Sequence, residues 1–490
     1  MSEKAGLYDL IISGAIIIDG SGDKQFRADV AVKNGVIVAI GDLQHLNAVN
    51  HVRANGCVLA PGFIDVHTHD DIHVIRQPDM LPKISQGVTT VIVGNCGISA
   101  SPAIISGTPP DPMTLLGSND EFIYTKFSEY SAAVNAAQPS VNVAALIGHT
   151  TLRQNHMDTL DRVASEEEIE KMREQLRAAL AEGALGLSTG LAYASAIASD
   201  TNEVKKLAQV LNEFGGVYTT HLRTEFDGII DAINEAFDIS IYAQSPLIIS
   251  HLKCAGAGNW GRSGEIISKI ESLAKDHPVG CDCYPYSASS STLDLKQVTE
   301  DFDIVITWST PHPEMSGRTL KAIAGEWQIN LLDAAKKLQP AGAVYHGMNE
   351  TDVRNILSHP LTMVGSDGLP NDPLPHPRLW GAFPRVLGHY SRDLALFSLP
   401  EAVRKMTSLS ADRFGLSDRG RIGLGLAADL VLFNPLLIKD TASFSKPAQI
   451  AEGIEAVWVN GVLSYHQQQL TGQRAGKFLP RSRDLRNGFH

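Results

Sequence analysis

Eight short apolar runs, separated by longer stretches with a helical pattern, occupy the middle of this 490-residue chain. Short runs bounded by turn residues are typical of buried strands. A strand followed by a helix, repeated along the chain, indicates parallel βαβ units. Eight such units predict a closed (β/α)8 barrel of the TIM type, in the α/β class. The runs are residues 62–66, 88–93, 141–147, 184–187, 216–220, 247–250, 279–283 and 362–365.

Two of the connecting stretches carry more information than the others. Residues 167–181 have a helical pattern, and Ser165 with Glu168 predicts a capping box at the start of that helix. Residues 287–345, between the last two runs, are too many for a simple connection. We therefore expect an insertion over the barrel mouth, in the place where lids are often found.

Both ends of the chain have the pattern of short strands separated by turns. Asn34-Gly35 and Asn460-Gly461 are strong hairpin signals. Neither end is large enough to fold alone, so we expect residues 1–61 and 415–490 to pair into one small β-sandwich domain. Residues 62–414 then form the barrel. The terminal strands are expected at residues 9–18, 29–32, 36–40, 57–60, 429–433 and 456–460.

The composition narrows the class of protein. The net charge is −13, from 41 basic and 54 acidic side chains, which argues against a nucleic-acid partner. The 5 cysteines are scattered, as expected in a reducing compartment. No apolar stretch approaches the ~20 residues of a spanning helix, and none resembles a signal peptide. We expect a cytoplasmic protein without a membrane partner, either a monomer or a homodimer.

Metal-binding side chains stand where the predicted strands end. The carboxyl ends of barrel strands meet at one face, which is where barrel active sites lie. Imidazole, thiolate and carboxylate are the groups that bind zinc, so their convergence predicts a zinc site. The residues are His67, His69, Cys96, His221, His251 and Asp367.

Three other patterns are weaker. Residues 186–190 match GxSxG around Ser188, but no helix start follows, so a barrel strand and its loop is the preferred interpretation. Residues 256–261 match GxGxxG and are interpreted as an active-site loop. Cys281 and Cys283 share one face of a strand and are expected to pack in the core, with Asp282 facing the other way. His149 either lines the pocket or packs.

Several segments resemble known enzymes. Residues 61–69, Pro-Gly-Phe-Ile-Asp-Val-His-Thr-His, resemble the opening metal motif of the amidohydrolase superfamily. Residues 85–97, 365–368, 376–381 and 384–393 resemble the N-acyl-D-amino-acid deacylases, or D-aminoacylases. The resemblance runs nearly end to end. Cys96 and the His-Pro-Arg-Leu-Trp segment at 376–380 are its most specific features.

The resemblance implies roles for individual residues. Cys96, His221 and His251 match the ligands of a tightly bound zinc, and His67 and His69 match a second, weaker metal position that Cys96 can bridge. Asp367 matches the catalytic carboxylate, which can also contact the second metal. Three residues match groups that hold the substrate α-carboxylate, namely Lys253, Tyr284 and Arg378. Five match positions near the side-chain pocket, namely Ala192, Thr299, Tyr345, His346 and Met348.

The expected activity is zinc-dependent hydrolysis of N-acyl-D-amino acids, with water activated by the metal and Asp367 as proton shuttle. Arg378 suits a carboxylate because its planar fork can bind both oxygens. The D-preference comes from the resemblance alone. Neutral side chains are slightly favoured, while Lys296 or His346 would serve a D-glutamate or D-aspartate derivative. The alternatives are a cyclic-amide hydrolase, a metal-free serine hydrolase built on Ser188, and a non-catalytic scaffold.

Overall fold

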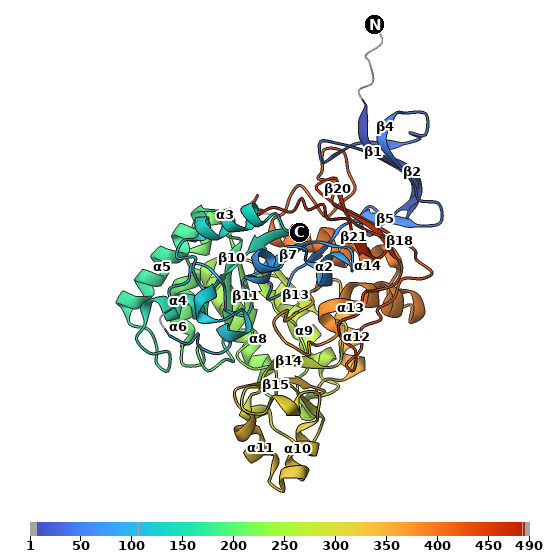
Figure 1. Cartoon of the computed structure of the whole chain (residues 1–490). Coiled ribbons are helices and arrows are strands. Elements are labelled where there is room, and N and C mark those ends of the chain that lie inside the picture. Colours follow the sequence, from blue (N-terminus) through green and yellow to red (C-terminus); the bar gives the residue numbers. More distant parts are fainter. Residues whose placement is uncertain (1–6, 106, 483, 486–490) are drawn as a thin grey trace.

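The structure is a computed structural model that describes residues 7–105, 107–482, 484 and 485. Residues 1–6 and 486–490 of the predicted terminal segments lie outside the described residues. Figure 1 shows the course of the chain. The two terminal segments lie side by side, apart from the region that the middle of the chain forms.

All eight apolar runs carry strands, and these strands run parallel to their neighbours. One sheet pairs β6 (Phe63–Asp65), β7 (Val88–Val93) and β8 (Asn142–Ala145). The second has the order β17 (Thr362–Val364), β13 (Val279–Cys283), β12 (Leu247–Ile249), β11 (Val217–His221), β10 (Gly186–Gly190) and β9 (Ile147–Gly148). Only Leu146 separates β8 from β9, and a parallel bridge from Thr68 to Gly368 joins the chain beyond β6 to that beyond β17.

Helices surround these strands (Figure 1). They include α3 (Phe127–Ala137), α4 (His149–His156), α5 (Glu166–Ala181), α6 (Thr201–Ala208), α8 (Ile229–Ala243), α9 (Ser263–Ala274), α12 (Glu350–Ser358), α13 (Arg378–Arg385), α14 (Leu399–Met406) and α15 (Ser408–Phe414). The predicted capping box of α5 is present: Glu168 N donates to Ser165 Oγ at 3.3 Å, and Ser165 N donates to Glu168 Oε2 at 2.7 Å. Among the described residues, no helix combines the length and apolar character that crossing a bilayer requires.

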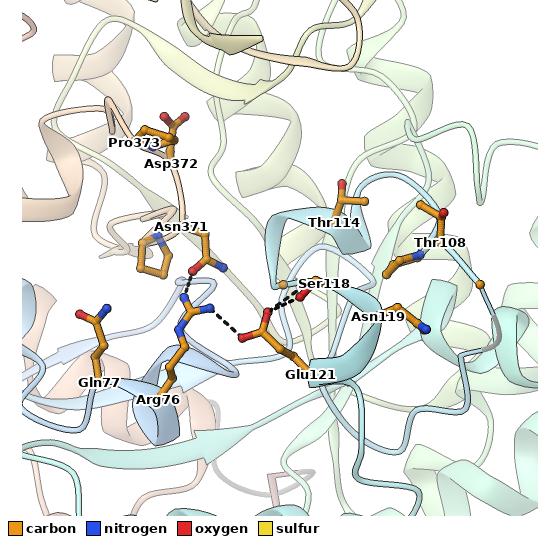
Figure 2. Close-up of a pocket in the computed structure, with 14 residues that line it drawn as sticks. Arg76, Gln77, Thr108, Thr114, Ser118, Asn119, Glu121, Asn371, Asp372 and Pro373 are labelled. Carbon is orange, nitrogen blue, oxygen red and sulfur yellow. Dashed lines mark hydrogen bonds and ion pairs between the residues drawn. The ribbon is translucent and has the colours of Figure 1, made fainter. Parts of the chain in front are cut away.

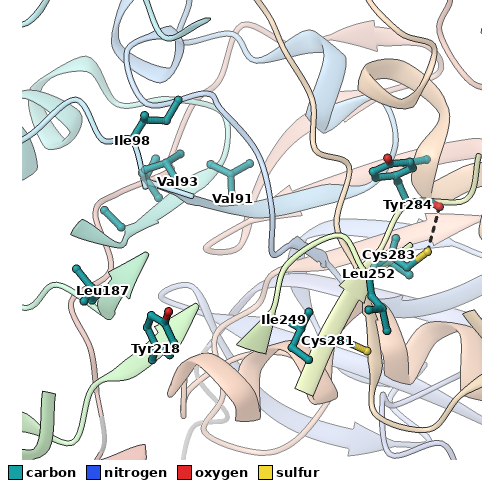
Figure 3. Close-up of a cluster of buried hydrophobic side chains, with 14 of the residues drawn as sticks. Val91, Val93, Ile98, Leu187, Tyr218, Ile249, Leu252, Cys281, Cys283 and Tyr284 are labelled. Carbon is teal, nitrogen blue, oxygen red and sulfur yellow. Dashed lines mark hydrogen bonds between the residues drawn. The ribbon is translucent and has the colours of Figure 1, made fainter. Parts of the chain in front are cut away.

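The two faces of the central strands bury different clusters. Val91 and Val93 of β7 pack towards the helices, with Cys281 and Cys283 of β13 in the same cluster (Figure 3). Ile92, between the two valines, belongs to a second cluster with α15 and residues of the C-terminal tail. This division follows from the two-residue period of a strand. It confirms the prediction that the paired cysteines pack in the core.

Both chain ends contribute to one nine-stranded sheet. Its first half contains β1 (Tyr8–Ile17), β2 (Phe26–Lys33), β3 (Val36–Gly41), β4 (Ala48–Arg53) and β5 (Val58–Pro61), and its second half β18 (Leu430–Phe433), β19 (Ile454–Val459), β20 (Val462–His466) and β21 (Gln469–Leu470). The halves join where β5 pairs antiparallel with β18. The predicted hairpins are present, and Asn34 and Asn460 both adopt positive φ, at 52° and 48°.

The insertion folds around its own core. Strands β14 (Ser289–Thr292), β16 (Ala341–Tyr345) and β15 (Ile304–Ser309) form an antiparallel sheet in that order. Helices α10 (Leu320–Trp327) and α11 (Leu331–Leu338) pack on it. In Figure 1 this unit lies at the opposite end of the molecule from β1, β2 and β4.

One buried carboxylate ties the terminal sheet to the central strands. Asp429, which precedes β18, forms an ion pair with Arg419. It also accepts hydrogen bonds from Asn142 Nδ2 of β8 at 2.9 Å and from Asn460 N at 2.6 Å. Its exposed fraction is 3%, so the contacts with protein groups replace those with water.

Replacing Asp429 with alanine is therefore expected to lower the free energy of unfolding by about 3–5 kcal/mol, because the buried guanidinium of Arg419 loses the one of its two carboxylate partners that is itself buried. Urea unfolding followed by fluorescence measures the change. Asp418→Ala is the matched control, since Asp418 also pairs with Arg419 but its side chain is 57% exposed; its cost should stay below about 1 kcal/mol. Equal costs for the two variants would contradict the role given to Asp429.

Candidate metal centre

Six potential metal ligands from five strand ends lie together. Their donor atoms fall into two groups, each within 4.8 Å: His67, His69, Cys96 and Asp367, and Cys96, His221 and His251. Cys96 belongs to both groups. Its Sγ lies 3.2 Å from His67 Nε2 and 3.3 Å from His251 Nε2. Asp367 Oδ1 lies 3.3 Å from His69 Nε2.

The donor set fits zinc by its chemistry and by its surroundings. Thiolate, imidazole and carboxylate are the ligands that zinc takes in proteins. Metal-binding histidines usually give their second ring nitrogen to a carboxylate, and two of these do. His251 Nδ1 lies 2.9 Å from Glu225 Oε1, and His67 Nδ1 lies 3.4 Å from Asp282 Oδ2. The opposite nitrogens of both rings face Cys96, which belongs to both donor groups.

The electrostatics of the cluster favour ionised ligands. Burial opposes ionisation of the Cys96 thiol, but the neighbouring imidazoles of His67 and His251 outweigh it and hold the pKa of the thiol well below its usual value. Burial also opposes ionisation of Asp367, yet Arg378 and His69 hold the pKa of this carboxyl well below its usual range. Thiolate and carboxylate are the forms that bind a metal cation.

The loop that carries Cys96 depends on close backbone approach. Cys96 has φ 53° and is flanked by Gly97 at φ 78°. A Cβ on Gly97 would lie 2.6 Å from Gly190 N at the end of β10. Ser188 of β10 donates to Gly94 O and accepts from Gly97 N at 3.0 Å. The Ser188 hydroxyl therefore supports the Cys96 loop, and its partners include no histidine among the described residues.

A buried seam holds Asp367 against the two histidines that follow β6. Asp65, two residues before His67, accepts from Ser366 N at 2.8 Å and Ser366 Oγ at 2.6 Å. Lys83 Nζ donates to Asp65 at 2.7 Å and to Ser366 Oγ at 2.8 Å. None of these three side chains is exposed. The seam joins the first and last central strands at the level of the metal ligands.

The residues expected to bind a carboxylate lie beside the cluster. Arg378, the first residue of α13, places Nη1 2.9 Å from Asp367 Oδ2, and its guanidinium lies 4.6 Å from the ring centroid of Tyr284. Lys253 Nζ bonds Glu225 and lies 2.7 Å from His251 Nδ1. The structure thus brings all three expected residues to the same side of the donor cluster.

Only some of the five residues expected near the side-chain pocket lie close to the donor cluster. Met348 Sδ accepts from Tyr284 OH at 3.6 Å, and Ala192 is half-buried beyond β10. The Tyr345 hydroxyl turns into the insertion, where it donates to Thr292 O at 3.0 Å. Thr299 lines a different cavity, of about 250 Å³, on the insertion. His346 packs against Phe444, a contact that involves the terminal domain.

Sequence reasoning missed several residues of the site. Glu225 follows β11 in an irregular loop, where no periodicity marks it. Tyr193 lies tilted against His221, with 4.8 Å between the ring centroids. Asp282 does face away from the two cysteines, as expected, but its partners are His67 and the backbone N of His251. A charged residue inside an apolar strand was the available signal for Asp282.

The remaining patterns have structural roles. His149 Nε2 lies 3.0 Å from Glu203 Oε1, beside the buried Arg153, and is outside both donor groups. The GxGxxG segment packs against the end of the insertion, where Gly256 N donates to Gly347 O at 2.8 Å.

A cavity of about 980 Å³ lies next to the segment that follows Asp367. Figure 2 shows Arg76 among the lining residues, hydrogen-bonded to Asn371 and at 2.7 Å to Glu121. Among the described residues that line it, none is a candidate ligand. The cavity is thus separate from the donor cluster.

A buried donor cluster at strand ends is the arrangement of a metal-dependent hydrolase. The chain belongs to the amidohydrolase family, whose model matches residues 52–465. Its relatives in Alcaligenes xylosoxydans xylosoxydans include a D-aminoacylase, 46% identical over 97% of this chain and 98% of the relative. An N-acyl-D-aspartate deacylase is 44% identical over 96% and 95%, and an N-acyl-D-glutamate deacylase 42% identical over 99% and 98%.

Solved structures agree with these relatives. A D-aminoacylase structure matches with a TM-score of 0.95 and 47% identity, covering 97% of this chain and 100% of the other. An N-acyl-D-glutamate deacylase of Bordetella bronchiseptica matches with a TM-score of 0.94 and 42% identity, with the same coverage. That structure contains zinc and a phosphonate inhibitor that mimics the tetrahedral intermediate.

Replacing Glu225 with glutamine is expected to weaken zinc binding about 10–100-fold, because His251 loses the carboxylate that orients its ring. Competition with a chromophoric chelator measures the affinity. Glu235→Gln is the control, since Glu235 pairs with Arg223 at 2.8 Å instead; its zinc affinity should equal that of the parent. A parent-like affinity in Glu225→Gln would rule out this role.

Proposed function

We propose that this chain is a zinc-dependent hydrolase that cleaves the amide bond of N-acyl-D-amino acids, releasing a carboxylate and a free D-amino acid. The carrying observation is the cluster around Cys96, with Arg378 in contact with Asp367 beside it. The names and near-complete coverage of the relatives support the substrate class.

The proposed architecture is a (β/α)8 barrel at residues 62–414, with a lid at about 287–345 and a β-sandwich domain made of residues 1–61 and 415–490. The successive parallel pairings and the Thr68–Gly368 bridge support a closed barrel. The pairing of β5 with β18 supports a shared terminal domain. We also propose a cytoplasmic location, supported by the five free cysteines.

Cys96, His221 and His251 would hold one zinc ion. His67 and His69, with Cys96 and Asp367, would hold a second and weaker metal. When bound, zinc polarises the amide carbonyl and lowers the pKa of bound water towards ~7. Glu225 and Asp282 orient the imidazoles from behind.

Asp367 serves as the proton shuttle. The new C–O bond forms between water and the carbonyl carbon, and Asp367 takes the proton that water releases. The carboxylate then delivers this proton to the amide nitrogen as the C–N bond breaks. The nearby Arg378 guanidinium stabilises the ionised form of Asp367 before the reaction begins.

Arg378, Lys253 and Tyr284 hold the substrate carboxylate. Arg378 Nε is buried and makes no hydrogen bond within the described part of the chain, which leaves a donor for a ligand. A free carboxylate matches such a guanidinium, whereas a cyclic amide has none to offer. This favours linear N-acyl amino acids over the cyclic-amide alternative.

Neutral side chains are the proposed preference. Lys296 is exposed on the insertion, within the 3₁₀ turn Leu295–Gln297. Burial outweighs the attraction of Asp303 and lowers the pKa of His346, so this imidazole is neutral at physiological pH. The competing proposal is an acidic side chain, as in the substrates named for the N-acyl-D-aspartate and N-acyl-D-glutamate deacylases.

Metal removal is expected to abolish hydrolysis of N-acetyl-D-methionine, and added zinc should restore it. The purified protein should contain zinc by elemental analysis. It should cleave N-acetyl-L-methionine far more slowly than N-acetyl-D-methionine. Activity that survives complete chelation would overturn the metal mechanism and favour Ser188. Zinc without D-selective cleavage would overturn the substrate assignment alone.

The preferred side chain is tested by comparing N-acetyl-D-methionine with N-acetyl-D-glutamate and N-acetyl-D-aspartate. We expect the largest kcat/KM for the methionine derivative, because Lys296 is exposed and His346 is neutral, so neither is set to pair with a second carboxylate. A clear preference for either acidic derivative would reverse that conclusion.

A further inference from the structure

A loop of the terminal domain reaches the edge of the candidate active site. Residues 434–453 connect β18 to β19, and we call them the β18–β19 loop. Phe444 of this loop has its ring centroid 4.7 Å from that of His346 and 4.9 Å from that of His376. His346 follows the last strand of the insertion, and His376 precedes α13. Three separate parts of the chain therefore meet at Phe444.

A continuous series of contacts connects Phe444 to the reacting carboxylate. His376 Nδ1 accepts a hydrogen bond from Arg378 N at 3.0 Å, and Arg378 contacts Asp367. The His376 ring also lies 6.5 Å from the Tyr284 ring, on which the Arg378 guanidinium stacks. Phe444 is thus two contacts away from the groups that are proposed to bind the substrate carboxylate.

The surface that Phe444 forms with the two histidines is aromatic and uncharged. Burial and the nearby Arg378 hold the pKa of His376 well below its usual value. His346 is also neutral, as described above. Among these rings, Phe444 is 42% exposed, so part of its side chain is accessible. Contact between such a surface and an apolar group lowers the free energy, because both surfaces are removed from water.

Two arginines of the 384–393 segment fix the β18–β19 loop in place. Arg385 Nη1 pairs with Asp440 Oδ2 at 3.1 Å while its Nε donates to Pro285 O, next to Tyr284, at 2.8 Å. Arg392 Nη1 donates to Ile438 O at 2.8 Å and Leu436 O at 3.2 Å. The segment begins inside α13, the helix whose first residue is Arg378. It therefore connects the loop with the helix that is proposed to bind the substrate carboxylate.

A glycine in the same segment allows the loop to come close. A Cβ on Gly388 would lie 2.3 Å from Ile438 O, so any larger residue would displace the loop backbone. The resemblance to D-aminoacylases implies no role for residues 384–393. In the structure it seats a loop from one end of the sequence against the site built by the middle.

We propose that Phe444 is a specificity-determining residue, which forms with His346 and His376 an apolar wall against the side chain of the D-amino acid. The side chain and the carboxylate share the α-carbon, whereas the acyl group is attached through nitrogen. A wall that begins at the carboxylate-binding residues therefore meets the side chain. The inference rests on the proposed function and extends it to a substrate class with large apolar side chains.

The test compares kcat/KM for N-acetyl-D-leucine with that for N-acetyl-D-alanine in Phe444→Ala. The leucine-to-alanine ratio is expected to fall about 10-fold, chiefly through KM, because loss of an apolar contact is worth a factor of this order. Leu437→Ala is the matched control: Leu437 lies in the same loop and is 57% exposed, and its ratio should equal that of the parent.

A second variant removes the loop's support without touching the wall. Arg392→Ala should lower the ratio in the same direction, since the backbone carbonyls of residues 436 and 438 lose their donor. An unchanged ratio in Phe444→Ala, or an equal fall in Leu437→Ala, would overturn the proposal while N-acetyl-D-alanine is still cleaved. A parent that cleaves neither substrate would instead overturn the proposed function, and the two failures are thereby distinguished.

Discussion

The buried seam of Asp65, Lys83 and Ser366 is the interaction on which the rest of the site depends. It joins the strand that carries His67 and His69 to the strand that carries Asp367. A fully buried lysine and carboxylate are costly unless every donor and acceptor finds a partner, and here the hydroxyl and backbone of Ser366 supply them. The distance between the Asp367 carboxylate and the two histidines is therefore held by buried polar contacts.

The site is assembled from all three parts of the chain. The central strands supply the donors around Cys96, and in the proposed site His346 follows the insertion and Phe444 comes from the β18–β19 loop. Arg378 lies where these contributions meet, because its guanidinium contacts Asp367 and its backbone contacts His376. Changes in distant parts of the sequence can thus alter substrate choice while leaving the ligands untouched.

The sequence predicted what regular periodicity encodes. Each of the eight apolar runs is a strand, and the six donors were found because strand ends must converge in a parallel arrangement. Glu225 and Phe444 could not be found this way, since both lie in irregular loops and act through contacts with residues outside their own segments. Tyr345 shows a related limit: the resemblance implied a place near the side-chain pocket, but its hydroxyl bonds Thr292 within the insertion.

The pairing of β5 with β18 also has a consequence for synthesis. Val58 and Phe433 are partners in one ladder, so β5 has no neighbour on that side until most of the chain has left the ribosome. An unpaired strand edge attracts other strands, and β5 keeps such an edge until β18 has been synthesised. This pairing is therefore a late event in synthesis, and the protein's yield in a cell should depend on how well that waiting edge is shielded.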